Sequence, residues 1–459
     1  MTDKYFGSSS EPSIFDKILS TPGHQDDSST TAILTSIHNA SDPIQVSDDI
    51  RDLWMPVEHE PGVPPILTMP GVLSVEDLND PVKETVSTVL GAEEARKTSR
   101  LTCNDVTQDE RGLRKLIEEG CFRAAVNLTS RLLTIYGQGY GRLGQPAKHT
   151  PHSLQLWFTR FSLLAKLSLL ELLQMESDAF GDLCRPDINY EFYPEMYSNR
   201  KGSMASFSFR LLLAELPMFL GAPNIALQRL TTIFNICTKI EESMDLTKSS
   251  GNNVKFWRRR RLRVVHSIIN CSLVQKNYNI AHNFIESLIG EKDSATPEEL
   301  GALYSVAGRI YMQCGDIVAA EKKVLSMRKL GLTSKVFQVQ ECVDRGLIYV
   351  AQNDFTEALK YFQKAAILEP TNAMISNNIA VCLLYLGKMK EAIATYENMI
   401  TSHPEQDLNE HFLINVCTLY ELESNNSRPK KLVQLQKIGK QRRDICMNID
   451  VCLKLHSNN

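Results

Sequence analysis

One spacing near the C-terminal end of the chain limits its possible folds more than any other feature. Three residues recur there at intervals of 34 positions, with Ala358, Phe362 and Pro370 returning as Ala392, Tyr396 and Pro404. A fixed period of about 20–50 residues is typical of solenoids, in which each unit packs only on its neighbours. A period of 34 residues is that of a unit of two antiparallel helices. The spacing therefore predicts a superhelix of paired α-helices.

The residue types in these two units suit paired helices. Small residues stand where the two helices of a unit would meet, namely Gly346, Ala358, Ala380 and Ala392. An aromatic residue follows in the second helix and would pack on the next unit. A proline then ends that helix, because it lacks a backbone N–H and disfavours helix in the residue before it. We therefore predict an all-α fold, a tetratricopeptide-repeat α-solenoid.

Composition divides the chain into three parts. Residues 1–50 carry two lysines against eight acidic residues and few aromatic ones, so we expect an acidic disordered segment. Residues 51–83 are rich in proline, which predicts an extended arm. Apolar residues at helical spacing predict the solenoid over residues 84–459, with insertions near 134–152 and 241–256. The clearest repeats are expected at 301–334, 339–372 and 373–406.

Charge, cysteines and motifs argue against nucleic-acid binding and against catalysis. The 50 basic and 54 acidic side chains give a net charge of −4. The 11 cysteines form no C-x-x-C pair, and the ten histidines show no metal-ligand spacing. Residues 139–144 match G-x-G-x-x-G without the preceding strand that a nucleotide site needs. We expect no enzyme activity, cofactor, metal or small-molecule substrate, and, because neither a signal peptide nor a membrane span is evident, a cytoplasmic protein.

The first helices of the repeats line the face on which such arrays usually bind. The repeat register places there Ser305, Arg309 and Val343, followed by the candidate protein-binding residues Leu347, Val350, Met374, Asn377, Val381, Leu384 and Tyr385. These positions are mostly apolar or neutral, which disfavours the carboxylate clamp of chaperone adaptors. An apolar groove suits an apolar helix or strand of a partner protein. The alternative is that these residues pack against a neighbouring subunit or against the N-terminal arm.

A basic cluster is the other candidate protein-binding surface. It consists of Arg258, Arg259, Arg260, Arg261 and Arg263. Arginine forks suit carboxylates and phosphates, so the cluster would fit an acidic partner or an anionic membrane surface. The alternative, which we favour, is a solvated first turn of a helix beginning near residue 262, since charge runs are usually solvated faces. The basic run 428–443 has the same two interpretations.

Several segments go beyond a generic repeat and resemble one family. They are "GQGYG" (137–141), "SLQLWF" (153–158), "YEFYPEMY" (190–197), "KGSM" (201–204), "NNIAVCLLYLGK" (377–388) and "LYELES" (419–424). Together they resemble the subunit 12 family of trafficking protein particle (TRAPP) complexes, the tetratricopeptide-repeat subunit of metazoan TRAPP III. The resemblance covers roughly residues 51–459, in order, including both insertions.

The resemblance implies a function that spacing and composition do not show. It implies a non-catalytic scaffold subunit of the TRAPP III tethering and Rab guanine-nucleotide exchange complex. Such a subunit would act in vesicle-mediated ER-to-Golgi transport, Golgi organisation and autophagy. Its partners would be other TRAPP subunits, with a peripheral contact to membrane at the ER–Golgi intermediate compartment and Golgi. The alternative function is a free-standing tetratricopeptide adaptor, for example a chaperone or mitotic scaffold protein.

Overall fold

The computed structural model shows an all-α chain. It describes residues 44–55, 67–74, 76–97, 100–146, 148–181, 183–198, 200–246, 250–290, 296–402, 410–440, 444 and 449–455. Within these ranges the only β-type pairs are two isolated bridges, Thr68 with Pro146 and Asn189 with Ser203. The predicted all-α tetratricopeptide fold is confirmed by this architecture.

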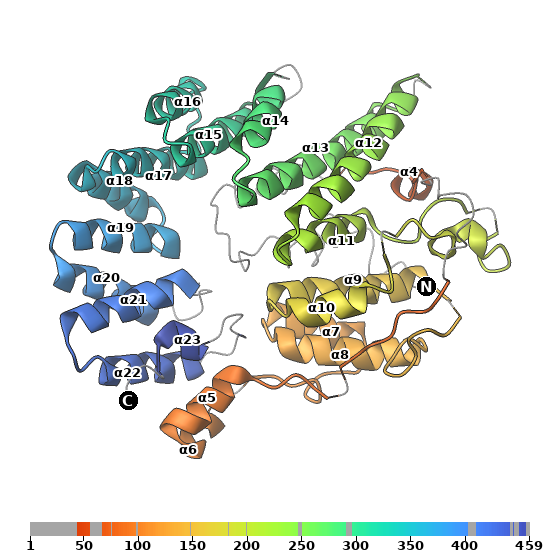
Figure 1. Ribbon diagram of the computed structural model, residues 1–459, viewed down its shortest axis with the longest axis horizontal. Coiled ribbons are helices and arrows are strands. Elements are labelled where there is room, and N and C mark those ends of the chain that lie inside the picture. The colour runs from red at the N-terminus through yellow and green to blue at the C-terminus, as the bar shows by residue number, and fades with distance from the viewer. Residues whose placement is uncertain are drawn as a thin grey trace.

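Most helices form antiparallel pairs that follow one another along a superhelix (Figure 1). The first half of the array contains α7 (Glu110–Glu118), α8 (Phe122–Ile135), α9 (Pro151–Lys166), α10 (Leu170–Ser177), α11 (Phe207–Phe219), α12 (Pro223–Leu246), α13 (Gly251–Val274) and α14 (Tyr278–Gly290). The second half contains α15 (Pro297–Gln313), α16 (Ile317–Lys329), α17 (Lys335–Ala351), α18 (Phe355–Leu368), α19 (Ala373–Tyr385), α20 (Met389–Ser402), α21 (Glu410–Glu423) and α22 (Arg428–Gly439). Shorter helices lie outside these pairs: α4 (Asp48–Arg51), α5 (Pro81–Leu90), α6 (Ala92–Arg96) and α23 (Ile449–Leu453).

Local sequence signals set the ends of several helices. Helix α15 begins with a capping box, in which the side chain of Thr296 accepts from the backbone N–H of Glu299 and the Glu299 side chain accepts from the N–H of Thr296. Gly315 and Gly387 end first helices with φ of 81° and 76°, a left-handed conformation that glycine adopts without strain. Such caps satisfy backbone groups that a helix end leaves unpaired.

The repeat positions identified from the 34-residue spacing lie in the core. Ala358, Phe362 and Ala392 are 0% exposed and Tyr396 is 1% exposed. A Cβ atom built on Gly346 would lie 2.7 Å from Cε1 of Phe362, so the glycine is what allows α17 and α18 to approach. The small residues at the contact between paired helices therefore allow the close approach that the repeat pattern indicated.

The two expected insertions differ from each other in structure. The one near 134–152 corresponds largely to the loop that joins α8 to α9. The one near 241–256 is instead mostly helical, because α12 continues to Leu246 and α13 already begins at Gly251. Buried apolar residues explain this difference. Met244 and Trp257 belong to the apolar core between α12 and α13, so this core extends into the segment that was expected to be an insertion.

The N-terminal arm runs along the first helices of the array. The backbone N–H of Met69 donates to the carbonyl oxygen of Gln145 (2.7 Å), and that of Leu73 donates to Oε1 of Glu176 (3.0 Å). Glu176 also accepts from the buried Arg160 at 2.6 and 2.8 Å, and Arg160 donates to Ser74 in the arm at 3.0 Å. A buried ion pair thus ties residues 67–74 to α9 and α10.

The two ends of the array are joined, because α5 lies beside α22 and α23, so that the superhelix closes on itself (Figure 1). Helix α5 packs against α22 and α23, where Val82 and Val86 are 0% and 2% exposed. The backbone N–H of Asp444 donates to the carbonyl oxygen of Gly120 at 2.9 Å, and its side chain accepts from the N–H of Arg123 at 2.6 Å. Burial raises the pKa of the Asp444 carboxyl above its ordinary value.

The expectation for residues 1–50 needs one correction. Residues 1–43 lie outside the described residues, but residues 44–50 have a described structure and Asp48 begins α4. Ile50 packs against the apolar core of α11–α13. A composition averaged over fifty mostly polar residues does not reveal such a short apolar contact. Residues 51–83 likewise end in helix, since α5 begins at Pro81 with Asp80 as its cap.

Candidate protein-binding surfaces

A stripe of α19 forms the most exposed part of the predicted groove. Met374 and Tyr385 are 37% and 67% exposed, and between them lie the partly buried Asn377, Val381 and Leu384. Leu347 and Val350 on α17 are also partly buried. The ring of Tyr385 stacks on Phe355 with centroids 4.3 Å apart and an angle of 1°. The stripe therefore presents a thioether and a fixed aromatic ring to solvent.

Asn377 joins three helices in the structure. Its Oδ1 accepts from the hydroxyl of Tyr396 on α20 at 2.8 Å and from Nδ2 of Asn415 on α21 at 2.9 Å. Burial raises the pKa of Tyr396 to about 12, so the phenol stays a donor at neutral pH. The carbonyl oxygen of Asn377 is therefore used to fix the neighbouring helices.

The groove prediction is wrong for the residues nearer α15. Ser305 and Arg309 both donate to the carboxylate of Asp344, with 2.8 Å between Nε of Arg309 and Oδ1. All three are buried, as is Val343, so this part of the face is filled by contacts between α15 and α17. Burial raises the pKa of Asp344 although Arg309 lies beside it. The sequence analysis missed Asp344, because an acid within an apolar helix pattern gives no sign of a partner 35 residues away.

The arginine cluster does not lie at a helix start. Helix α13 begins at Gly251, so these residues occupy its third and fourth turns, and all of them are partly buried. Arg260 donates to the carbonyl oxygen of Arg51 at 2.8 Å, and Arg261 forms an ion pair with Glu241 at 2.7 Å. Burial lowers the pKa of Arg260 to about 9. The expectation of a solvated first turn is therefore wrong, since the buried Trp257 draws this segment into the core.

The second basic run also makes internal contacts. Lys431 on α22 is buried and its Nζ lies 2.6 Å from Oε1 of Glu421, while Lys430 pairs with Glu423. Residues 441–443 lie outside the described ranges. At least part of the run is thus used to hold α22 against α21.

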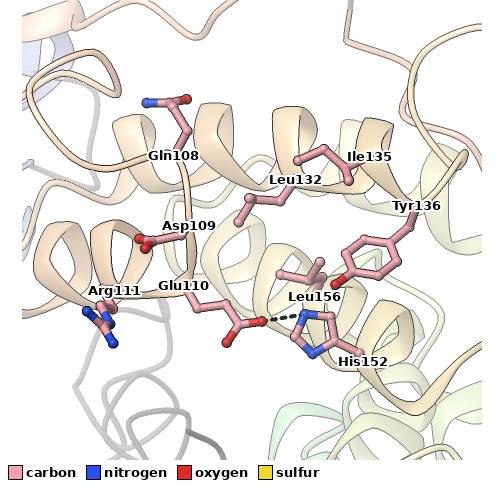
Figure 2. Close-up of a pocket in the computed structure, with 9 residues that line it drawn as sticks. All are labelled: Gln108, Asp109, Glu110, Arg111, Leu132, Ile135, Tyr136, His152 and Leu156. Carbon is pink, nitrogen blue, oxygen red and sulfur yellow. Dashed lines mark ion pairs between the residues drawn. The ribbon is translucent and has the colours of Figure 1, made fainter. Parts of the chain in front are cut away.

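A pocket of about 380 Å³ lies between α7, α8 and α9. Figure 2 shows Glu110 and His152 pointing toward each other as an ion pair at one side of the pocket, and Leu132 and Leu156 are among the other lining residues. The ring of Tyr136 lies 5.1 Å from that of His152. The lining is mixed, with Asp109, Glu110, Arg111 and His152 beside apolar side chains, and the described residues contain no group of three or more His, Cys, Asp or Glu side chains that could hold a metal ion. None of the helices in the described ranges is long and apolar enough to cross a membrane.

Comparisons with known proteins agree with the repeat fold and identify related sequences. A family model of the tetratricopeptide repeat matches residues 349–408. The chain is 40% identical over 406 residues to "Trafficking protein particle complex subunit 12" of Mus musculus, covering 85% of this chain and 50% of that protein. For the protein of that name in Homo sapiens the identity is 38% over 440 residues, covering 89% and 59%. The chain thus spans about half the length of the curated relatives it matches. A solved tetratricopeptide repeat protein from Parabacteroides merdae is 12% identical, with a TM-score of 0.36, over 67% of this chain and 100% of that one.

Proposed function

Since the chain belongs to the family of trafficking protein particle complex subunit 12, we propose that it serves as a scaffold subunit of that complex and catalyses no reaction itself. The observation that carries this proposal is the extent of the similarity, which covers 85–89% of the chain rather than one repeat motif. A solenoid with exposed apolar stripes and no cluster of metal-ligating residues in its described part suits a scaffold.

The proposal extends to the assembly and its cellular role. The assembly is TRAPP III, which couples tethering of vesicles to guanine-nucleotide exchange on a Rab GTPase. The chain acts there in ER-to-Golgi transport, Golgi organisation and autophagy, with a peripheral contact to membrane at the ER–Golgi intermediate compartment and Golgi. These are the roles that the resemblance of the chain to this family implies.

Within the complex, we assign partner binding to the stripe on α19. Met374 and Tyr385 offer apolar contact area, and the stack on Phe355 fixes one rotamer of Tyr385 before a partner arrives. Rigid aromatic anchors lose little conformational entropy on binding, and they are enriched among residues that dominate interface energies. Leu347, Val350, Val381 and Leu384 line the same face. For Arg258, Arg259 and Arg263, contact with an acidic partner stays a prediction.

Affinity capture tests this assignment. The full chain with Met374→Glu and Tyr385→Glu should recover fewer TRAPP subunits from cells than the unchanged chain. Its circular dichroism melt should shift only by the loss of the stack on Phe355, about 0.5–1.5 kcal/mol, because both side chains are exposed. Ile367→Glu is the matched control, since Ile367 is 81% exposed on the second helix of the preceding repeat. Equal recovery by the double variant and the control would refute the α19 site.

Size-exclusion of cell lysate separates the subunit from the free-standing adaptor. A subunit elutes together with the other TRAPP subunits, and mass spectrometry of those fractions identifies them. Elution of most of the chain at the volume of a monomer would contradict membership of the complex and favour an adaptor.

A further inference from the structure

Residues Asp48–Met55, here called the strap, lie in a groove formed by α11, α13 and the segment before α11. Three successive carbonyl oxygens of the strap accept hydrogen bonds from this groove: Ile50 from Nε1 of Trp257 (3.2 Å), Arg51 from Nη1 of Arg260 (2.8 Å) and Asp52 from the N–H of Ser203 (2.8 Å). Donors that read backbone carbonyls hold a peptide whatever its side chains are. These three donors therefore hold the strap through its backbone.

Apolar and aromatic contacts supply the second element of recognition. Ile50, Leu53, Trp54 and Met55 pack, partly buried, against the apolar core of α11–α13. The guanidinium of Arg210 lies 4.3 Å from the centre of a Trp54 ring. Arg260 lies 4.4–4.9 Å from the ring centres of Phe256, Trp257 and Phe207. Because these rings hold Arg260 in place, its donor is already positioned for the strap carbonyl.

Charges of the strap and of the groove are complementary. The strap has three aspartates and one arginine, whereas the groove side presents Arg200, Arg210 and Arg260. Nη2 of Arg200 lies 2.7 Å from Asp52 and 3.7 Å from Asp48. An acidic segment with apolar anchors therefore fits this surface better than a neutral or basic one.

The strap is nevertheless an imperfect occupant. The indole N–H of Trp54 is buried and has no acceptor among the described residues, and a buried donor left unpaired weakens the bound state. Helix α4 is a single turn of four residues with no buried side chain of its own. A segment that places an acceptor opposite this indole position, or a different aromatic side chain in it, would bind more tightly.

We propose that the α11–α13 groove is a docking site for an acidic segment with an aromatic anchor from a partner protein, and that the strap occupies this site in cis until such a segment displaces it. This site is separate from the α19 stripe, so each is tested on its own. The tethered strap competes with a partner segment for the groove. A partner segment therefore displaces the strap only if it binds the groove more tightly than the strap does.

Competition with a peptide of residues Ile44–Met55 tests the proposal. The labelled peptide is titrated, with anisotropy as readout, into the full chain and into a strap variant that carries Ile50→Ala and Trp54→Ala. We expect binding to the strap variant at least tenfold tighter than to the unchanged chain, because its own strap competes less well. A control peptide with Trp54→Ala should bind neither chain, and higher salt should weaken binding. Equal binding to both chains, or binding to neither, would overturn the proposal.

Hydrogen exchange on the unchanged chain gives an independent measurement. The amide of Ser203 is protected by the strap carbonyl of Asp52, so it should exchange faster than the buried Ile268 amide in α13 and slow down when excess peptide is added. Exchange of Ser203 no faster than that of Ile268, or loss of helix content in the strap variant, would show that the strap is part of the permanent core and not a displaceable occupant. Dimerisation at rising concentration would assign the groove to the strap of a second copy instead.

Discussion

Gly346 and Phe362 form the contact on which the close packing of α17 and α18 depends. In Gly346→Ala the new Cβ would lie 2.7 Å from Cε1 and 2.8 Å from Cζ of Phe362, closer than such atoms can approach. Phe362 is fully buried, so the ring has to shift inside a filled core, which costs about 1–3 kcal/mol. Alanine returns about 1 kcal/mol through its higher helix propensity. We therefore expect a net loss of up to about 2 kcal/mol in the free energy of unfolding, measured by urea denaturation.

Gly308 provides the matched control, because it has the same relative position in the preceding repeat. A Cβ atom there would meet Cγ2 of Val324 at 3.5 Å, an ordinary van der Waals contact. Only the helix-propensity gain then applies, so Gly308→Ala should stabilise the chain by about 1 kcal/mol. The two variants should shift the urea midpoint in opposite directions. If Gly346→Ala stabilised the chain as much as Gly308→Ala, the packing argument for α17 and α18 would be refuted.

Three further variants test other parts of the fold. Arg160→Met should cost about 3–5 kcal/mol because Glu176 stays buried without its cation, and adding Glu176→Leu should restore most of that loss; a double variant as unstable as the single one would contradict this. Ala392→Trp should lower the thermal midpoint by overpacking a fully buried contact between helices, at a cost of about 1–3 kcal/mol, and an unchanged midpoint would show that the repeat register is wrong. Burial lowers the pKa of His266 from 6.5 to about 4, so below pH 6.5 the unfolded chain binds a proton that the folded chain does not. This group alone should make stability fall by about 1.4 kcal/mol per pH unit from pH 6.5 toward 4; urea titrations should show a shallower fall for His266→Leu, and an equal one would exclude His266 as the cause.

The repeat core could be predicted from the sequence because its signal is local and repeated. Each of Ala358, Phe362, Ala392 and Tyr396 makes its contacts with residues of the same or the next repeat, so spacing alone carries the information. The groove positions on α17 and α19 were assigned from the same repeat register, and their role in binding a partner stays a prediction.

The strap and the buried ion pairs could not be predicted, because their partners are distant in sequence. Arg260 belongs to a run of arginines that resembles a solvated face, yet its hydrogen-bond acceptor lies 209 residues away on the strap. Arg309 was assigned to the groove, but Asp344 on the next repeat takes its Nε–H. A run of charged residues in the sequence does not identify the groups that will pair with them. The burial of a charged side chain therefore becomes evident only in the folded structure.

Closure of the superhelix constrains the order in which its contacts can form during synthesis. Glu94 on α6 and Gln436 on α22 are hydrogen-bonded across the closure, yet 342 residues separate them in the chain. At about 5–20 residues per second of synthesis, α6 leaves the ribosome roughly 20–70 s before α22 exists. During that interval Val82 and Val86 on α5 lack the contacts that α22 and α23 later provide. The contacts that close the superhelix can therefore form only after nearly all of the chain has been synthesised.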